Sequence, residues 1–278
     1  MLRKRVLTAL VLGPFIIWSV LTFSHPAIAV EMAVILVLAG WEWARLSGLK
    51  SQIGRVGYAT FIGGLLLLLA GWMHYDSSWL KIALYVIAAW WVLMLMLIIF
   101  SNRKEVQAIA KFSPLLVITN LFSGVFILSG AFISVVAMHQ QYGPTYILIT
   151  LILIWIADSA AYFTGKAFGK HKLAINVSPG KTWEGVVGGI LATIIAAYGF
   201  AIYLGLVSPK VIHFVLIVIV AICFSVVGDL VESLFKRRAG VKDSSQLLPG
   251  HGGILDRIDS LMSAAPFFLT GLLLTDIR

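Results

Sequence analysis

Residues 211–228 read VIHFVLIVIVAICFSVVG, eighteen residues that include no Asp, Glu, Lys or Arg. A helix needs about 20 mostly apolar residues to cross the hydrocarbon core of a bilayer, with a range of roughly 17 to 25. The run is apolar on all sides and shows no two-residue alternation, which favours a helix over a barrel strand. We therefore interpret residues 211–228 as a membrane-spanning helix.

Eight further runs resemble this one, so the chain is expected to cross the membrane about nine times. The nine predicted spans are Val6–Ser24, Ile28–Trp43, Val56–Met73, Ile82–Phe100, Phe112–Met138, Tyr146–Phe163, Gly185–Leu206, Val211–Gly228 and Ser260–Thr275. Only 12% of the 278 residues are charged, about half the share of a soluble domain. Cys223 is the single cysteine, which excludes a disulfide scaffold. The predicted fold is an all-α polytopic membrane protein, with full crossing by the first two spans left open.

The basic residues predict an orientation. With a cytoplasmic N-terminus, nine spans place 18 of the 21 Lys and Arg residues on the cytoplasmic side and only Lys81, Lys210 and Arg278 outside. Cytoplasmic loops of membrane proteins carry such an excess. We therefore expect the N-terminus inside and the C-terminus outside. Anionic head groups account for the net charge of +9, so no nucleic-acid partner is expected.

The chain divides into two regions by the chemistry of its loops. Residues 1–138 hold about five spans joined by plain loops, whereas residues 139–278 contain two polar, glycine-rich cytoplasmic segments, 164–184 and 231–259. Seven of the 12 acidic residues lie between positions 158 and 259. We therefore expect the catalytic region to be 139–278.

The segment 233–259 reads SLFKRRAGVKDSSQLLPGHGGILDRID and has three parts. A cationic cluster suited to phosphates comes first: Lys236, Arg237, Arg238 and Lys242. The sequence PGHGG at 249–253 predicts a tight turn whose glycines permit close approach to a ligand. Asp256 and Asp259 would then share a helix face and could hold a hard cation. Basic residues at lipid head groups and aspartates capping a helix are the alternative; the density of these features favours a phosphate-and-metal site.

Three acidic residues lie at or near membrane depth, where an ionisable group is a functional candidate. Asp229 and Glu232 follow the run 211–228 directly. If the last two helices are neighbours, Asp229 could add a third carboxylate to the Asp256 and Asp259 pair. Asp158 lies in an otherwise uncharged run, where it is either functional or a buried packing partner.

Residues 178–185 read SPGKTWEG, and the GKT triplet resembles the end of a phosphate-binding P-loop. Ile175 stands where that motif requires glycine, and no strand is expected before it, so we reject a P-loop. We predict instead that Ser178 caps a helix with Pro179 in its first turn. The free N–H groups and Lys181 would then bind an anion; a plain capped helix with a solvated lysine is the alternative.

The segment 233–259 resembles the signature of the phosphatidate cytidylyltransferase (CDP-diacylglycerol synthase) family. That pattern is Ser-x-apolar-Lys-Arg-x4-Lys-Asp-x-small-x2-apolar-Pro-x-His-Gly-Gly-apolar-x-Asp-Arg-apolar-Asp. The fixed positions are met by Ser233, Lys236, Arg237, Lys242, Asp243, Ser245, Pro249, His251, Gly252, Gly253, Asp256, Arg257 and Asp259. The runs 162–166 and 178–185 are also similar to the family, whereas residues before 155 match only in hydropathy and span number.

The resemblance implies that CTP and phosphatidate react to give CDP-diacylglycerol and pyrophosphate with Mg²⁺, at the cytoplasmic face of a bacterial inner membrane. It implies metal contacts for Asp229, Asp256 and Asp259. It implies catalytic roles, mainly in holding phosphates, for Lys236, Arg237, Lys242, Asp243, His251 and Arg257. Substrate contacts are expected from Ser178, Lys181, Thr182, Ser233, Gly252 and Gly253. Membrane lipids are further expected partners, and a homodimer is left open.

Several alternative functions can be compared with the same sequence features. A CTP-dependent transferase acting on another lipid phosphate would share the site and differ in its acyl-chain groove. The Asp-x2-Asp-Gly-x2-Ala-Arg motif of CDP-alcohol phosphotransferases is absent from the sequence. An ion-coupled transporter would explain Asp158 and Asp229 but not the segment 236–259, and inverted repeats are not evident. A non-catalytic lipid-binding scaffold would tolerate the loss of one aspartate.

Overall fold

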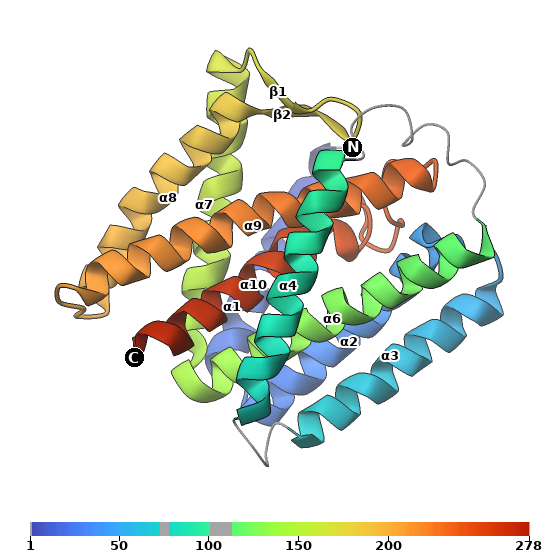
Figure 1. Ribbon diagram of the computed structural model, residues 1–278, viewed down its shortest axis with the longest axis horizontal. Coiled ribbons are helices and arrows are strands. Elements are labelled where there is room, and N and C mark those ends of the chain that lie inside the picture. The colour runs from blue at the N-terminus through green and yellow to red at the C-terminus, as the bar shows by residue number, and fades with distance from the viewer. Residues whose placement is uncertain (1, 73–77, 101–112, 278) are drawn as a thin grey trace.

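The chain forms a bundle of long helices with one small hairpin. The computed structural model describes residues 2–72, 78–100 and 113–277 (Figure 1). Its helices are α1 (Leu2–Thr22), α2 (His25–Leu46), α3 (Gln52–Trp72), α4 (Ser78–Phe100), α6 (Pro114–Tyr142), α7 (Pro144–Phe168), α8 (Trp183–Tyr203), α9 (Lys210–Arg238) and α10 (Leu255–Thr275). Strands β1 (Lys172–Ala174) and β2 (Ser178–Thr182) pair antiparallel. The all-α prediction is confirmed.

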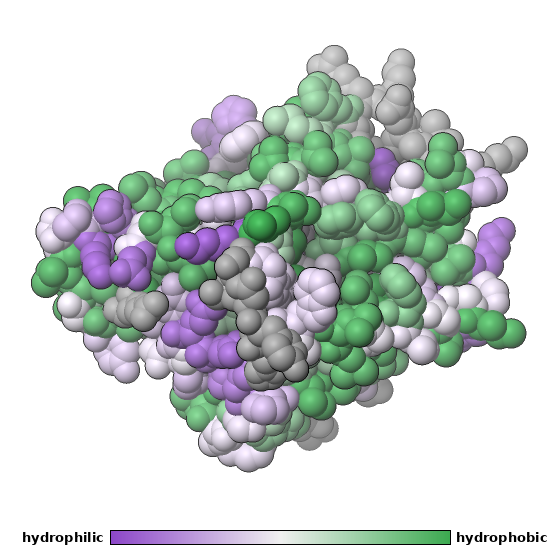
Figure 2. All heavy atoms as spheres, turned by 60° about the horizontal axis from the view of Figure 1, so that its bottom comes forward, coloured by the Kyte–Doolittle hydropathy of each residue, from purple (hydrophilic) through white to green (hydrophobic). Residues whose placement is uncertain are grey.

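The described helices correspond one to one with the nine predicted spans. Eight of them, α2 to α10, are long and apolar enough to cross a membrane, whereas α1 contributes the shorter apolar stretch Leu10–Thr22. The face in Figure 2 combines wide hydrophobic areas with a patch of hydrophilic residues. Several positions used in the sequence predictions lie outside the described residues: Met73, Arg103, Lys104, Lys111, Phe112 and Arg278.

Local sequence signals set several helix ends. The Ser113 side chain accepts a hydrogen bond from the Leu116 N–H at 3.2 Å and so caps α6. Gly143 ends that helix with a φ of 83°, a conformation that favours glycine. Pro144 then opens α7, where its missing N–H costs nothing.

Small residues bring the site-bearing helices close together. Helices α7 and α8 form one pair and α9 and α10 another, with α9 also packing on α8 (Figure 1). A Cβ atom on Gly189 of α8 would lie 2.9 Å from the carbonyl oxygen of Ala157 on α7. Helix α10 also packs against α6, α4 and α2, so the regions 1–138 and 139–278 are in direct contact.

The polar segment 231–259, expected to be a cytoplasmic loop, is partly helical. Helix α9 continues through Arg238 because no residue interrupts it before Gly240, which has a φ of 70°. Ser233, Lys236 and Arg237 therefore lie on the same helix as Asp229. The other segment, 164–184, begins as the end of α7 and then forms the β1–β2 hairpin.

Candidate active site

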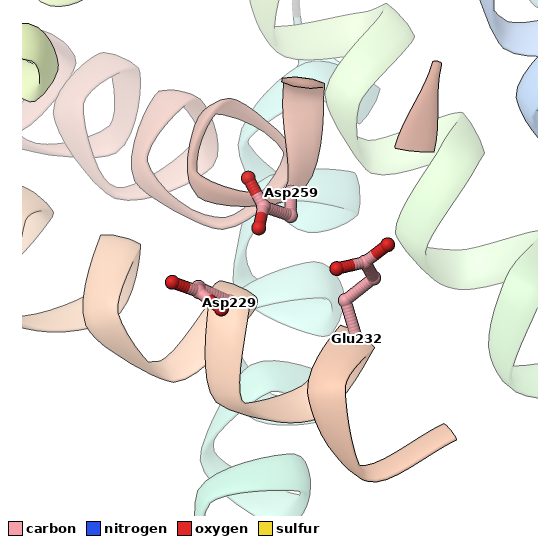
Figure 3. Close-up of side chains that lie close together, drawn as sticks. All are labelled: Asp229, Glu232 and Asp259. Carbon is pink, nitrogen blue, oxygen red and sulfur yellow. The ribbon is translucent and has the colours of Figure 1, made fainter. Parts of the chain in front are cut away.

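Three carboxylates meet between α9 and α10. Asp229 and Glu232 come from α9 and Asp259 from α10, and oxygens from all three lie within 4.8 Å of one another (Figure 3). Glu232 is only 1% exposed, and its Oε1 has no hydrogen-bond partner among the residues that the structure describes. Oxygen ligands in this arrangement suit a hard divalent cation. We call these three residues the carboxylate cluster.

The carboxylate cluster depends on helix periodicity and on one close helix crossing. Asp229 and Glu232 share a helix face because they are three residues apart. A Cβ atom on Gly228 would lie 2.4 Å from the carbonyl oxygen of Asp259 and 2.2 Å from Ser263 Oγ. Any larger residue at position 228 would therefore push α10, and Asp259 with it, away from α9.

The third member of the cluster differs from the sequence-based assignment. Asp229 and Asp259 do come together, but Glu232 rather than Asp256 completes the group. Asp256 Oδ2 instead accepts hydrogen bonds from the backbone N–H groups of Ser244, at 2.9 Å, and Gly253, at 2.8 Å. Asp256 thus organises the loop before α10, and its direct contact with a metal stays a prediction.

Lys236 connects the carboxylate cluster to that loop. Its Nζ lies 2.5 Å from Glu232 Oε2 and 2.6 Å from Asp256 Oδ1. Lys236 is 9% exposed, so loss of either carboxylate would leave its buried charge with one partner fewer, which is destabilising. The sequence predicts a phosphate contact for Lys236, whereas the structure places its ammonium group against carboxylates.

A cleft of about 440 Å³ lies beside the carboxylate cluster, lined by α7, β2, α8 and α9. Its polar lining residues are Asp158, Lys166, Ser178, Lys181, Thr182, Ser225 and Asp229. The cleft and the carboxylate cluster share Asp229, and Lys181 Nζ lies 2.7 Å from Asp229 Oδ2. Lysines beside an acidic group that could hold a cation suit a polyphosphate ligand.

The start of α8 differs from the prediction at Ser178. That residue begins strand β2 and does not cap a helix, because Ser178–Thr182 is extended and pairs with Lys172–Ala174. The cap is Thr182, whose side-chain oxygen accepts from the Gly185 N–H at 3.1 Å. Ser178 and Lys181 nevertheless line the cleft, so their predicted substrate contacts remain open to test.

The predicted tight turn at 249–253 is confirmed. The His251 N–H donates to the carbonyl oxygen of Leu248 at 2.9 Å, and Gly250 and Gly252 have φ angles of 77° and 84°. Packing within the chain explains why residue 252 is glycine, because a Cβ atom there would lie 2.7 Å from Asp256 Oδ2. The substrate contacts predicted for these glycines stay predictions.

The remaining predicted residues surround this centre. Four of them are exposed: Arg237, Lys242, Asp243 and Arg257. Arg237 Nε donates to the Val177 carbonyl oxygen at 3.3 Å and so ties α9 to the β1–β2 connection. Ser233 Oγ donates to Asp229 Oδ1 at 3.2 Å. Sequence reasoning left Glu232 without a ligand role, although its spacing from Asp229 was a usable signal.

These features define an integral membrane protein of many helices, with an acidic centre that could hold a metal beside a cleft lined by lysines. The chain belongs to the Cytidylyltransferase family, whose model matches residues 3–274. It is 38% identical to the phosphatidate cytidylyltransferase of Haemophilus influenzae over 96% of this chain and 97% of that protein.

Two further relatives carry the same name. The chain is 39% identical to the phosphatidate cytidylyltransferase of Pseudomonas aeruginosa, with 96% of each chain covered. It is 32% identical to that of Thermotoga maritima, over 95% of this chain and 94% of the relative. The family resemblance drawn from residues 233–259 is therefore confirmed, and it extends through the first half of the chain.

Proposed function

We propose that this chain transfers the cytidylyl group of CTP to phosphatidate, giving CDP-diacylglycerol and pyrophosphate. The observation that carries the proposal is its similarity, over nearly the whole length, to proteins named phosphatidate cytidylyltransferase. The site supports it, because both substrates are phosphate anions and the carboxylate cluster adjoins a lysine-lined cleft.

Mg²⁺ is the proposed cofactor, and the residues present fit it. The donors of the carboxylate cluster are all carboxylate oxygens, the ligand type that Mg²⁺ prefers. Within the described part of the chain the buried Glu232 Oε1 lacks a hydrogen-bond partner, as expected of an atom that coordinates a metal ion. Asp229, Glu232 and Asp259 would hold the ion, which when bound supplies neutralisation of phosphate charge.

The reaction makes modest chemical demands on the protein. A phosphate oxygen of phosphatidate, already anionic, attacks the α-phosphorus of CTP; the bond from that phosphorus to the bridging oxygen breaks, and pyrophosphate leaves. No strong base is required, so the residues act through positioning and charge neutralisation. Lys181 would contact the triphosphate in the cleft, and the exposed Arg237, Lys242 and Arg257 would hold phosphates nearby. Asp243 and His251 keep their predicted catalytic roles.

The proposed location is a bacterial inner membrane, with the site on the cytoplasmic side. Water-soluble CTP would reach a lipid head group there, and the 18 to 3 distribution of basic residues supports that orientation. Exposed apolar side chains on α7 and α8, such as Phe163 and Ile195, would contact lipid tails. A homodimer also stays a prediction, to be checked by light scattering in detergent.

The test is lipid-dependent turnover by the detergent-purified protein. With CTP and Mg²⁺, we expect a cytidine-containing lipid only when phosphatidate is added. A polyprenyl phosphate serves as the competing acceptor. If the polyprenyl phosphate reacted as fast as phosphatidate or faster, phosphatidate would not be the preferred substrate and the proposal would be wrong. Product formation without any added lipid phosphate would also overturn the proposal.

A further inference from the structure

A buried carboxylate from the first half of the chain contacts the loop before α10. Glu42, near the end of α2, is 0% exposed. Its Oε2 accepts the Leu255 N–H at 2.7 Å and lies 3.0 Å from Ser244 Oγ. Its Oε1 accepts the Ile254 N–H at 3.0 Å and the hydroxyl of Ser245. Four donors thus surround a carboxylate more than 200 residues away in sequence.

These contacts supply the N-terminal cap of α10. Ile254, the residue before the helix, makes no side-chain cap bond, and the first N–H groups of a helix need acceptors from outside it. A carboxylate in this position also interacts favourably with the positive end of the helix dipole. Helix α2 therefore holds the start of α10, the helix that carries Asp259.

The Glu42 contacts also reach the Lys236 network. Ser244 Oγ lies 2.9 Å from Asp256 Oδ2 as well as 3.0 Å from Glu42 Oε2. A hydroxyl has one proton, so it donates to one of these carboxylates at a time while staying within reach of both. Asp256 in turn pairs with Lys236, which pairs with Glu232. A continuous chain of contacts thus runs from α2 to the carboxylate cluster.

The neighbouring residue Trp43 fixes α2 against α9. Its indole N–H donates to the Asn120 carbonyl oxygen on α6 at 2.8 Å. Its ring centroid lies 4.5 Å from that of Phe235 on α9, the residue just before Lys236. Consecutive residues of α2 thus contact both helices whose separation determines the geometry of the carboxylate cluster.

Gly253 shows how tightly the Glu42 contact is built. A Cβ atom on Gly253 would lie 2.4 Å from Glu42 Oε1 and 2.0 Å from Ser244 Oγ. Real Cβ atoms do not approach so closely, so the loop reaches Glu42 only with glycine at this position.

We propose that Glu42 is a positioning residue for the carboxylate cluster, acting through the loop 244–254 and the first turn of α10. Glu42 is fully buried and is not among the residues that line the cleft. This role for Glu42 rests on the proposed metal centre. Its effect on turnover rests in addition on the proposed function.

The test compares Glu42→Gln with Glu31→Gln, a matched change on the same helix. Glutamine keeps the shape but removes the charge and turns an N–H₂ group toward donors. Hydrogen exchange followed by mass spectrometry should show faster exchange of the Ile254 and Leu255 amides in Glu42→Gln only. Mn²⁺ binding in the absence of substrates, followed by electron paramagnetic resonance, should weaken about 10-fold, the scale of losses at residues that orient metal ligands.

Turnover adds an independent readout. In Glu42→Gln we expect kcat to fall and the Mg²⁺ concentration for half-maximal rate to rise, with the KM for phosphatidate unchanged. Unchanged amide exchange would overturn the capping contact. Faster exchange with unaltered Mn²⁺ binding would overturn the positioning role, as would absence of Mn²⁺ binding to the unsubstituted protein. Mn²⁺ binding without any cytidylyl transfer would count against the proposed function alone.

A milder variant covers the case in which Glu42→Gln does not fold. Ser245→Ala removes one of the four donors and leaves the carboxylate in place. It should shift amide exchange and Mn²⁺ affinity in the same direction by a smaller factor. Wild-type values for both measurements in Ser245→Ala, together with wild-type stability, would contradict the proposal.

Discussion

The ammonium group of Lys181 lies 2.7 Å from the carboxylate of Asp229, which joins the β1–β2 hairpin to α9 at the edge of the carboxylate cluster. Lys181 reaches this position from the last residues of a strand, not from a helix start. The pair therefore connects the proposed nucleotide cleft with the proposed metal centre through two residues that are 48 positions apart in sequence.

The first prediction concerns Lys181. Lys181→Met should reduce kcat/KM for CTP by about 100-fold, because a charge aimed at the triphosphate is lost in a partly buried site. Lys172→Met, at an exposed residue of strand β1, is the control and should stay close to wild type. The measurement is the steady-state rate with CTP varied at saturating phosphatidate. Equal losses of kcat/KM in the two variants would argue against a specific role for Lys181.

The second prediction separates the two kinds of carboxylate. Asp259→Asn and Glu232→Gln should lower turnover about 100-fold and weaken Mn²⁺ binding, since both lie in the carboxylate cluster. Asp256→Asn should act mainly on stability, costing about 3 kcal/mol because it leaves the buried Lys236 with one partner fewer. Mn²⁺ titration and thermal unfolding in detergent measure the two effects. If Asp256→Asn abolished Mn²⁺ binding without loss of stability, the sequence-based ligand set would be right instead.

The third prediction concerns Gly253. Gly253→Ala should destabilise the protein by about 1 to 3 kcal/mol, because the added methyl group would overlap Glu42 and Ser244. Gly199→Ala on α8 provides the control, since apart from the adjacent backbone of α8 no atom of the described residues lies within 4 Å of a Cβ atom at that position. Thermal unfolding of the two variants gives the comparison. A Gly253→Ala protein as stable as Gly199→Ala would show that the loop accommodates a side chain.

The fourth prediction concerns orientation in the membrane. In a Cys223→Ser background, a membrane-impermeant maleimide added to intact cells should label Val207→Cys, between α8 and α9. Lys242→Cys should react only after the cells are opened, because the loop before α10 is predicted to be cytoplasmic. The opposite labelling pattern would invert the topology and place the cleft outside.

Much of the fold could be predicted because lipid leaves the backbone few choices. A spanning segment must satisfy its own hydrogen bonds, so each long apolar run indicated a helix. The predicted ends were less exact: the run 211–228 became a helix from Lys210 to Arg238. Hydropathy marks the segment inside the bilayer, whereas helix ends depend on breakers such as Gly240.

Site residues whose positions depend on helix periodicity could be predicted from the sequence. Residues whose positions depend on tertiary contacts could not. Asp229 and Asp259 meet as expected, but periodicity could not show that Asp256 would face the loop and Lys236. Ser178 matched a local capping signal that was overridden by pairing with β1. Glu42 interacts with Ser244 across 202 residues, so no local pattern could assign it.

The most direct test of the central claim follows the label of CTP under identical conditions. Purified protein receives phosphatidate, Mg²⁺ and CTP labelled on either the α- or the γ-phosphate. We expect α-label to enter the lipid fraction and γ-label to appear only in pyrophosphate, and we expect Asp259→Asn to slow both about 100-fold. Transfer of γ-label to lipid, or α-label incorporation that is unaffected by Asp259→Asn, would contradict it.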